Sequence, residues 1–458
     1  MIENDAFKLL LINLFHLNPD DIANILCTTF NKMMVLVVTL TDKHQACPYC
    51  GFTAPKIKEY VTKEITHSAL TTQKCIIKYR ARRYKCSCCG KTYYEFNPFV
   101  FKSQKISILT VHNILKDLKD FNETFTSVAR RYHVSPTSVS TIFDKHVDIG
   151  RNSLPEIINF DEVYAFKSEK SKYVCVLLDF KKQIPVDVLP NRKKEYLLNY
   201  FQKIPLEERK KVKYACSDMY EVYRDVVHKV FPSCCMLLDY FHLSQDFHRK
   251  MNEVRIKVMK GYKDNKASDE YYLLKKFNWL LFKNPEDEDK YGRLFDVERE
   301  RKYNSHFKSY MNYYDLRKKL LEINNDLTIC YSLKLELVDF YSKSTIDNAK
   351  VNLENLIRSC IDTNIDEMIA FSNNLINWKQ EIINSFTIVG TEYKVEADKG
   401  QVVVCNKKVN NAIIENRNKI IKCIKNNANG YTNWSRFRNR VMYVLDPNAT
   451  FSLEPREK

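Results

Sequence analysis

Three acidic residues in the sequence have the types and spacing needed to bind divalent cations together. Asp161 ends the apolar run 157–160, which is typical of a strand, and Asp218 follows a second such run at 213–217. Glu415 lies in segment 411–419, where the pattern predicts a helix. Two strand-end aspartates and one helical glutamate can converge on two Mg²⁺ or Mn²⁺ ions, which activate a water or 3′-hydroxyl and stabilise the leaving oxygen in phosphodiester chemistry. We therefore expect such a site here.

The residues around Glu415 favour this interpretation over an ordinary surface charge. Helical spacing places four of its neighbours along one face of the predicted helix: Asn411, Asn418, Lys419 and Lys422. Between positions 407 and 440 the chain has nine lysines and arginines and one acid, Glu415 itself. An isolated carboxylate in a basic field suits a site for metals and phosphates, and we expect Lys419 and Lys422 to contact DNA.

Composition supports a polyanionic partner. The 458 residues carry a formal net charge of +17, which favours nucleic acid first and an anionic membrane surface second. The longest apolar run, 33–40, is far shorter than the ~18 residues of a membrane span, and the acidic N-terminus does not resemble a signal peptide. We expect no membrane partner and a cytoplasmic, nucleoid-associated protein.

Two cysteine knuckles predict a structural zinc site. Cys47 and Cys50 form the first and Cys86 and Cys89 the second, each followed by glycine. Two residues between thiolates allow both sulfurs to reach one tetrahedral Zn²⁺, and four thiolates leave no open position. Cys88, and less strongly Cys75, compete for a ligand place. Most of the single cysteines are interpreted as small buried hydrophobes.

A basic run lies between the knuckles. Its members Arg80, Arg82 and Arg83 are expected to contact phosphate, with a solvated surface as the alternative. The 51–85 gap also contains strand-like stretches that could form a ribbon.

Segment 125–143 predicts two short helices around a turn. Val134 is the buried turn residue, Ser135 caps the second helix, and Pro136 occupies its first position, where no N–H is missed. This pattern favours a helix-turn-helix that binds DNA over a plain helical linker. The residues expected to face the major groove are Thr137, Ser138, Ser140 and Thr141.

The order of the expected elements indicates an α/β layer followed by a long helical segment. Strand patterns at 157–160, 173–179 and 184–189 precede alternating helix and strand up to 238. Residues 243–390 read as almost wholly helical, and 1–40 as one or two helices that lead into a strand at 35–40.

These features resemble the DDE transposases of bacterial insertion sequences, most closely the ISL-three family. No single motif is decisive, but their order and spacing are specific and cover nearly the whole chain. The matching segments are 47–51, 86–90, the helix-turn-helix, Asp161, 217–220, Asp239-x-x-His242, 280–284, 327–336, Asn411-x-x-x-Glu415, Asn418, Lys422, 430–431 and 437–438. The chain departs at Ala412 and Asn416, where the family usually has glycine.

The resemblance implies an RNase H-like catalytic core, with a mixed five-stranded sheet and helices, interrupted by a long all-α insertion. Asp161, Asp218 and Glu415 carry over as the metal-binding triad, and Asp239 and His242 as a second catalytic motif. His242 could orient a phosphate or a metal-bound water, or it could be a satisfied core histidine. The expected domains are a zinc-binding region at 1–98, a helix-turn-helix at 99–150, core at 151–243, insertion at 244–395, and core with a basic segment at 396–458.

The resulting hypothesis is a cut-and-paste transposase. It would bind terminal inverted repeats and target DNA as a homodimer or larger synaptic assembly, with two Mg²⁺ or Mn²⁺ ions per active site and a structural Zn²⁺. Tyr220 and Trp279 are interpreted as packing residues, while Trp434 could pack or stack on a base. The rivals are a DNA-binding repressor with an inactive core and another RNase H-like nuclease.

Overall fold

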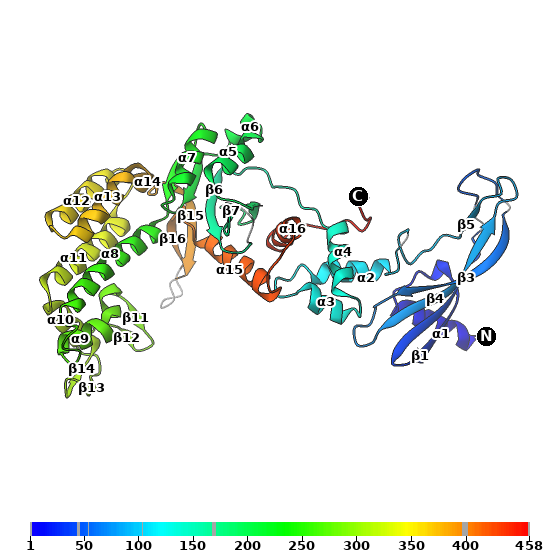
Figure 1. The fold of residues 1–458 in the computed structure, drawn as a ribbon, viewed down its shortest axis with the longest axis horizontal. Coiled ribbons are helices and arrows are strands. Elements are labelled where there is room, and N and C mark those ends of the chain that lie inside the picture. The colour runs from blue at the N-terminus through cyan, green and yellow to red at the C-terminus, as the bar shows by residue number, and fades with distance from the viewer. Residues whose placement is uncertain are drawn as a thin grey trace.

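The computed structural model describes residues 2–43, 46–53, 55–102, 104–166, 171–395 and 402–456. Figure 1 shows four parts in a row. An N-terminal sheet lies at one end and a helical region at the other. A three-helix unit and a central sheet lie between them. In the described part of the chain, no helix combines the length and the apolar character that a bilayer span requires.

The N-terminal part is a helix packed on a five-stranded sheet with strand order β1-β2-β4-β3, in which β5 pairs with β4. Its buried core comes from the helix and from alternate residues of the inner strands. The segment 22–30, which we expected to be helical, is a strand. The elements are α1 (Ile2–Leu14), a 3-10 turn (Pro19–Asp21), β1 (Ile22–Phe30), β2 (Met33–Leu40), β3 (Lys56–Thr66), β4 (Cys75–Lys85) and β5 (Thr92–Tyr94).

Three helices follow: α2 (Ile108–Asp117), α3 (Phe125–Arg131) and α4 (Pro136–His146). The α3 helix begins with a capping box between Thr124 and Ser127. The Oγ atom of Ser135 accepts the N–H of Ser138, and Pro136 is the first residue of α4, so the predicted cap is confirmed. Apolar residues from all three helices form one core.

The central sheet is mixed, with strand order β10-β9-β6-β7-β8. The strands β6, β7 and β8 are antiparallel neighbours, whereas β9 is parallel to β6 and β10 is parallel to β9. Both faces are covered, which explains why its strands are nearly continuous apolar runs. The strands are β6 (Ile157–Val163), β7 (Val174–Asp179), β8 (Pro185–Leu189), β9 (Tyr214–Ser217) and β10 (Cys235–Leu238).

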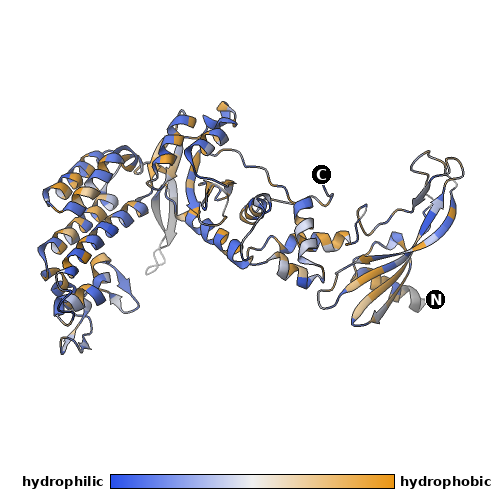
Figure 2. Ribbon diagram, viewed as in Figure 1, coloured by the Kyte–Doolittle hydropathy of each residue, from blue (hydrophilic) through white to orange (hydrophobic). Residues whose placement is uncertain are grey.

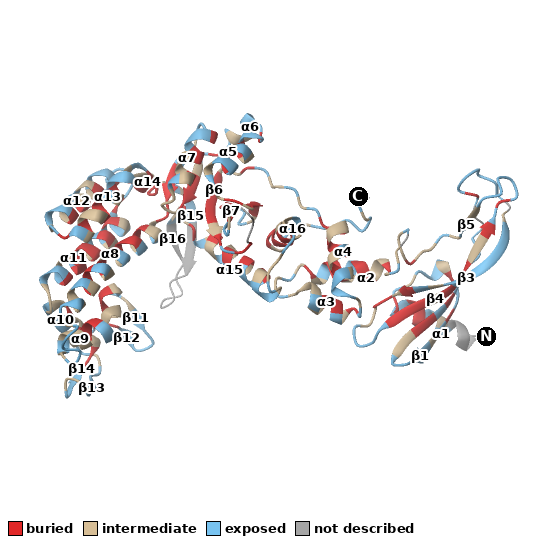
Figure 3. Cartoon of the chain, viewed as in Figure 1, coloured by how far each residue is buried: buried red, intermediate tan, exposed pale blue. Residues whose placement is uncertain are grey.

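Helices from distant segments cover the two faces of this sheet. The α5 (Lys194–Gln202) and α7 (Glu221–Val230) helices pack on one face, and the short α6 (Leu206–Arg209) connects toward β9. The other face carries α15 (Ala412–Asn427) and α16 (Trp434–Leu445), the last helices of the chain. Figures 2 and 3 show apolar and buried positions concentrated along the strands of the sheet.

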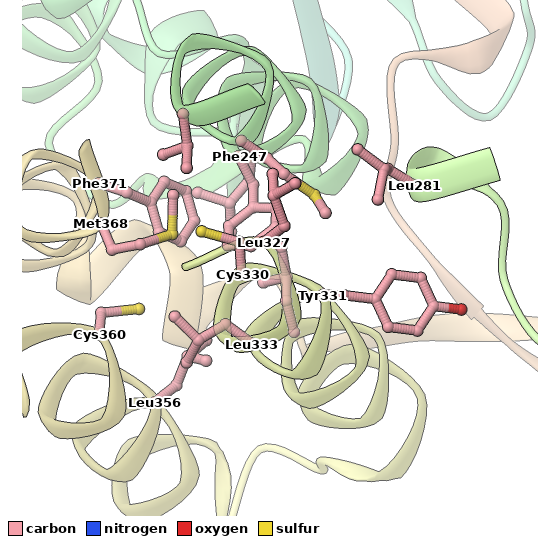
Figure 4. Close-up of a cluster of buried hydrophobic side chains, with 14 of the residues drawn as sticks. Phe247, Leu281, Leu327, Cys330, Tyr331, Leu333, Leu356, Cys360, Met368 and Phe371 are labelled. Carbon is pink, nitrogen blue, oxygen red and sulfur yellow. The ribbon is translucent and has the colours of Figure 1, made fainter. Parts of the chain in front are cut away.

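The region between β10 and α15 is mainly helical and has its own core, part of which Figure 4 shows around Phe247, Cys330 and Phe371. Its helical elements are α8 (Tyr240–Lys260), α9 (Asp269–Lys276), a 3-10 segment (Asn278–Phe282), α10 (Tyr313–Glu322), α11 (Asn325–Lys343), α12 (Ala349–Asp362), α13 (Asp366–Asn377) and α14 (Lys379–Asn384).

This region is less uniformly helical than expected. Two small antiparallel hairpins interrupt it, and a third hairpin leads back to the sheet. Their strands are β11 (Glu288–Asp289), β12 (Gly292–Arg293), β13 (Lys302–Asn304), β14 (Ser309–Met311), β15 (Ile388–Val395) and β16 (Val402–Lys408). The α8 helix crosses the expected domain boundary at 243–244 without a break. It begins directly after the sheet and continues into the helical region.

Candidate active site and metal centres

Asp161 lies inside β6, where it pairs with Val176 of β7. We expected the strand to end at this residue, but it continues to Val163 because the next polar residue, Glu162, is also accommodated in the sheet. The Nδ2 atom of Asn418 in α15 donates to the Oδ2 atom of Asp161 at 2.8 Å. This bond ties the Asp161 carboxylate to the helix that carries Glu415.

Asp218 and Asp239 lie at the carboxyl ends of two neighbouring parallel strands. Asp218 directly follows β9 and Asp239 directly follows β10, in which Leu238 pairs with Ser217. The N–H of Asp239 donates to the carbonyl of Ser217 at 3.0 Å. Because parallel strands end at the same edge, both aspartates are brought to one side of the sheet. Asp239 also precedes α8, whose first turn supplies His242.

Glu415 lies in the first turn of α15, and the residue before this helix anchors it to the sheet. Asn411 is fully buried, and its N–H donates to the Asp239 Oδ1 atom at 3.3 Å. Its side-chain carbonyl accepts from the Nδ2 atom of Asn159 at 2.7 Å. Its own Nδ2 atom donates to the carbonyl of Phe160 at 3.3 Å. Sequence reasoning missed Asn159 because it looks like an isolated polar residue in an apolar run.

His242 lies among the carboxylates. Its Nε2 atom is 3.7 Å from the Asp239 Oδ2 atom and 3.8 Å from the Glu415 Oε1 atom. Ligand atoms of these three residues all lie within 4.8 Å of one another, which is compact enough for one ion. Asp161 and Asp218 are not part of this three-residue group, but His242 interacts electrostatically with both.

Burial destabilises the charged form of these acids. Desolvation raises the pKa of Asp161 to about 7, and the nearby charge of Asp218 adds to the rise. Desolvation also raises the pKa of Asp218 and of Asp239, and His242 partly opposes both shifts. Like-charged carboxylates held together in a buried site are typical of a functional cluster.

Several buried polar atoms in this cluster have no hydrogen-bond partner among the described residues. They are the Asp218 Oδ1, Asp239 Oδ2 and His242 Nε2 atoms. Buried acceptors without donors are costly, and a divalent cation would satisfy them. Oxygen-rich donor sets are those that Mg²⁺ and Mn²⁺ prefer, so the residues present fit such ions.

The opposite face of β6 carries a polar group that the sequence did not reveal. Glu162 forms an ion pair with Arg192 and accepts the hydroxyl of Tyr223 at 3.1 Å. The Arg192 guanidinium also lies 4.7 Å from the ring centroid of Tyr220, which packs against Tyr223. Tyr220 is therefore a packing residue beside Asp218, as expected.

The four predicted zinc ligands come together near the N-terminus. Cys47 Sγ lies 3.7 Å from Cys89 Sγ, and Cys50 Sγ lies 3.5 Å from Cys86 Sγ. Four sulfurs around one zinc ion at about 2.3 Å would be about 3.8 Å apart, so the cluster fits Zn²⁺. The two rival cysteines lie elsewhere: Cys88 is exposed outside the cluster and Cys75 is buried in the core of β4.

The two knuckles share one backbone geometry. Gly51 and Gly90 have φ angles of 75° and 71°, which favour glycine, and each donates its N–H back to the first cysteine of its knuckle. Hydrogen bonds from the backbone N–H groups of Cys89 and Cys88 lower the pKa of the Cys86 thiol to about 7, whereas desolvation and the neighbouring thiols raise the pKa of Cys50 to about 12.

The arginines expected to contact phosphate are not equivalent. Arg82 is bound to the buried carboxylate of Glu95 at 2.7 Å, and Arg83 is bound to Glu59 at 2.6 Å. Arg80 is exposed and lies 4.8 Å from the ring centroid of Tyr60. Arg80 therefore fits the expected role best, whereas Arg82 holds the sheet to the residues after β5.

The expected DNA-facing residues of α4 and α15 also divide by exposure. Thr137 and Thr141 are exposed on α4, whereas Ser138 contributes to the cap and the Ser140 hydroxyl donates to the carbonyl of Thr137. On α15, both Lys419 and Lys422 are exposed to solvent.

The two tryptophans considered for base stacking have protein contacts. Trp279 packs edge-on against Tyr313 in the helical region, as expected. Trp434 packs against Phe166 and Phe437 at ring-centroid distances of 5.2 Å and 5.8 Å. These contacts favour the packing interpretation of Trp434.

Comparison with known proteins identifies the class of protein to which this fold and this acidic cluster belong. A family model of DDE transposases of the ISL3 (ISL-three) type, described as "Transposase", matches residues 158–397, just over half of the chain. The chain therefore belongs to this transposase family. The match contains Asp161, Asp218, Asp239 and His242 and ends before Glu415.

A full-length relative extends this similarity beyond the matched span. The chain is 19% identical over 413 residues to the "Transposase for insertion sequence element IS1001" of Bordetella parapertussis. The alignment covers 89% of this chain and 91% of that protein, so the two share nearly their whole lengths.

Proposed function

We propose that this protein is the transposase of an insertion sequence, which cleaves DNA at the element's ends and joins the freed ends to target DNA. The observation that carries the proposal is that His242 lies between Asp239 and Glu415 and interacts electrostatically with Asp161 and Asp218. These residues come from three strands and two helices, and a merely structural role does not account for the buried, unsatisfied oxygen atoms of Asp218 and Asp239.

The topology supports an RNase H-like core. In our proposal β6, β7 and β8 are its antiparallel strands, and β9 and β10 are the parallel strands that extend the sheet beside β6. Asp161 would be the first acid, Asp218 the second, and Glu415, on the helix packed across β6, the third. The helical region would then be an insertion between β10 and α15.

Asp161, Asp218 and Glu415 would hold two divalent ions, which supply an activated water or 3′-hydroxyl and stabilise the leaving oxygen of a phosphodiester. Asn418 orients the Asp161 carboxylate, and Asn411 fixes the start of α15 against Asp239. We assign His242 and Asp239 as positioning residues, because His242 Nε2 lies 3.7 Å from Asp239 and 3.8 Å from Glu415. The burial of the cluster strengthens these electrostatic interactions because it excludes water.

The N-terminal parts would bind the DNA. We assign α3 and α4 as a helix-turn-helix, with Thr137 and Thr141 exposed toward the major groove. The cysteine cluster would hold a structural Zn²⁺ in a ribbon whose exposed Arg80 contacts phosphate. Two element ends must be cut together, so a homodimer or larger assembly would be the active form.

The test is a cleavage assay with duplexes that contain the DNA flanking the reading frame. The wild-type protein should cleave at the element's ends only with Mg²⁺ or Mn²⁺, and Asp161→Asn should abolish cleavage while binding is retained. Equal cleavage by wild type and Asp161→Asn would overturn the metal assignment. End binding without any cleavage by the wild type would favour a repressor.

A further inference from the structure

A polar groove lies where the three-helix unit meets the loop between α15 and α16. Its volume is about 450 Å³. The residues on its walls that can donate hydrogen bonds or carry charge include Thr124, Thr126, Arg130, Asn429, Thr432 and Arg436. Arg130 is exposed, and no carboxylate of the described residues lies within ion-pair distance of it. The groove is therefore suited to an anionic ligand.

The acids near the groove are already paired with other cationic side chains. Arg436 donates from its Nε and Nη2 atoms to Asp144 at 3.0 Å and 2.7 Å. Glu123 forms an ion pair with Arg131. Both carboxylates therefore have a cationic partner, although Arg131 is shared with Asp117, and Arg130 adds an exposed positive charge.

The groove is held rigidly because α16 is part of two cores at once. Phe437 and Val441 pack on the central sheet, while Tyr443 belongs to the core of the three-helix unit. The buried Arg440 guanidinium donates through Nη2 to the carbonyls of Asp120 and Glu123 at 2.8 Å and 2.7 Å. These contacts fix the position of α3 and α4 relative to the acidic cluster.

The α15 helix connects this groove to the acidic cluster. Glu415, Lys419, Lys422 and Asn426 follow one another along one face at helical spacing, and the groove begins at Asn427. The sixteen residues of α15 span about 24 Å, which is the length of about seven base pairs of DNA. Figure 1 shows α15 running from the central sheet toward α3.

We propose that the groove binds a backbone phosphate of the element's end, and that the exposed face of α15 carries the same DNA backbone to the active site. The inference rests on the proposed function and deepens it, because it fixes the distance between the bases read by α4 and the bond that is cut. Two of its cationic contacts are Arg130 in the groove and Lys422 on α15.

The test measures how the affinity for a random-sequence 30-base-pair duplex depends on KCl concentration between 50 and 200 mM. Each lost phosphate contact should reduce the slope of log affinity against log salt by about 0.9. We expect Arg130→Gln to show one such reduction and the double variant Arg130→Gln with Lys422→Gln to show two. Arg130→Lys should keep the wild-type slope because the charge is retained.

Lys266→Gln is the matched control, since Lys266 is exposed in the helical region, away from the groove. It should keep the wild-type slope. A wild-type slope in Arg130→Gln, with normal DNA binding by the wild-type protein, would overturn the groove assignment alone. Failure of the wild-type protein to bind any duplex would overturn the proposed function as well.

Discussion

The two candidate metal centres of this chain differ in how their ligand atoms are arranged and in whether those atoms have hydrogen-bond partners. In the thiolate cluster, two knuckles of the same geometry present four sulfurs at spacings that one tetrahedral ion would fill. In the acidic cluster, the ligands come from distant elements and differ in type. Three buried polar atoms there are left without partners among the described residues.

This difference fits our proposal that one centre stabilises the fold and the other performs chemistry. Four thiolate ligands leave a zinc ion no open coordination position. The cysteine site can therefore stabilise the fold but cannot bind a substrate. Carboxylates with raised pKa values and unsatisfied oxygens have the properties of a site that binds ions together with a substrate. Four predictions test whether this contrast holds.

The largest effect should come from removing one acid of the open site. Asp161→Asn should lower metal-dependent cleavage by about 10³-fold or more, because one ligand of the catalytic ions is lost. Single-turnover cleavage of an end-containing duplex measures this. Asp179→Asn is the control, since Asp179 is also buried on the central sheet but caps the turn after β7. Similar losses in both variants would mean that folding, not metal binding, is affected.

Removing one cysteine ligand of the zinc site should affect folding more than DNA cleavage. Cys47→Ser should remove the bound zinc and make residues 46–94 sensitive to protease, since structural zinc contributes folding free energy directly. Metal analysis and limited proteolysis provide the measurements. The control Cys88→Ser changes the exposed cysteine outside the cluster and should retain one zinc per chain. Zinc loss in both variants would contradict the ligand assignment.

His242→Gln should have an intermediate effect. Residues that orient a metal ligand typically contribute 10–100-fold, so cleavage should fall by about that factor while DNA binding is unchanged. His228→Gln, on the exposed side of α7, is the matched control. A loss as large as that of Asp161→Asn would instead make His242 a metal ligand, together with Asp239 and Glu415.

The smallest expected effect is on the pH dependence of stability in the metal-free protein. Burial raises the pKa of Asp161 from 3.8 to about 7, so the folded state binds more protons than the unfolded state between those values. Stability should therefore fall as pH rises from about 4 to 7. Asp161→Asn should flatten this part of the profile in thermal unfolding. Added Mg²⁺ should stabilise the wild type at pH 8, and a profile unchanged by the substitution would contradict the assigned pKa shift.

Sequence patterns predicted the elements whose local signals are strong. Ser135 and Pro136 mark the start of α4 through cap chemistry, and the spacing of the knuckles alone identifies the four clustered cysteines. Asp218 could be placed because it follows a short apolar run bounded by polar residues. In each case the signal lies within a few residues of the feature.

Features that depend on long-range contacts could not be predicted. We expected Asp161 to end its strand because the next residue, Glu162, is charged. The ion-pair partner of Glu162 is Arg192, thirty residues further along the chain, so nothing nearby in the sequence indicates that Glu162 fits within the strand. The role of Asn159 depends on Asn411, 252 residues further along the chain. The segment 22–30 lacks a clear two-residue period, so its pairing with β2 decides that it is a strand.

The most direct test of the account is to locate Mn²⁺ in crystals of the protein by its anomalous scattering. We predict ions between Asp161, Asp218 and Glu415, with His242 beside them. Mn²⁺ held only by Asp239, His242 and Glu415, with Asp161 and Asp218 without any ion, would contradict it.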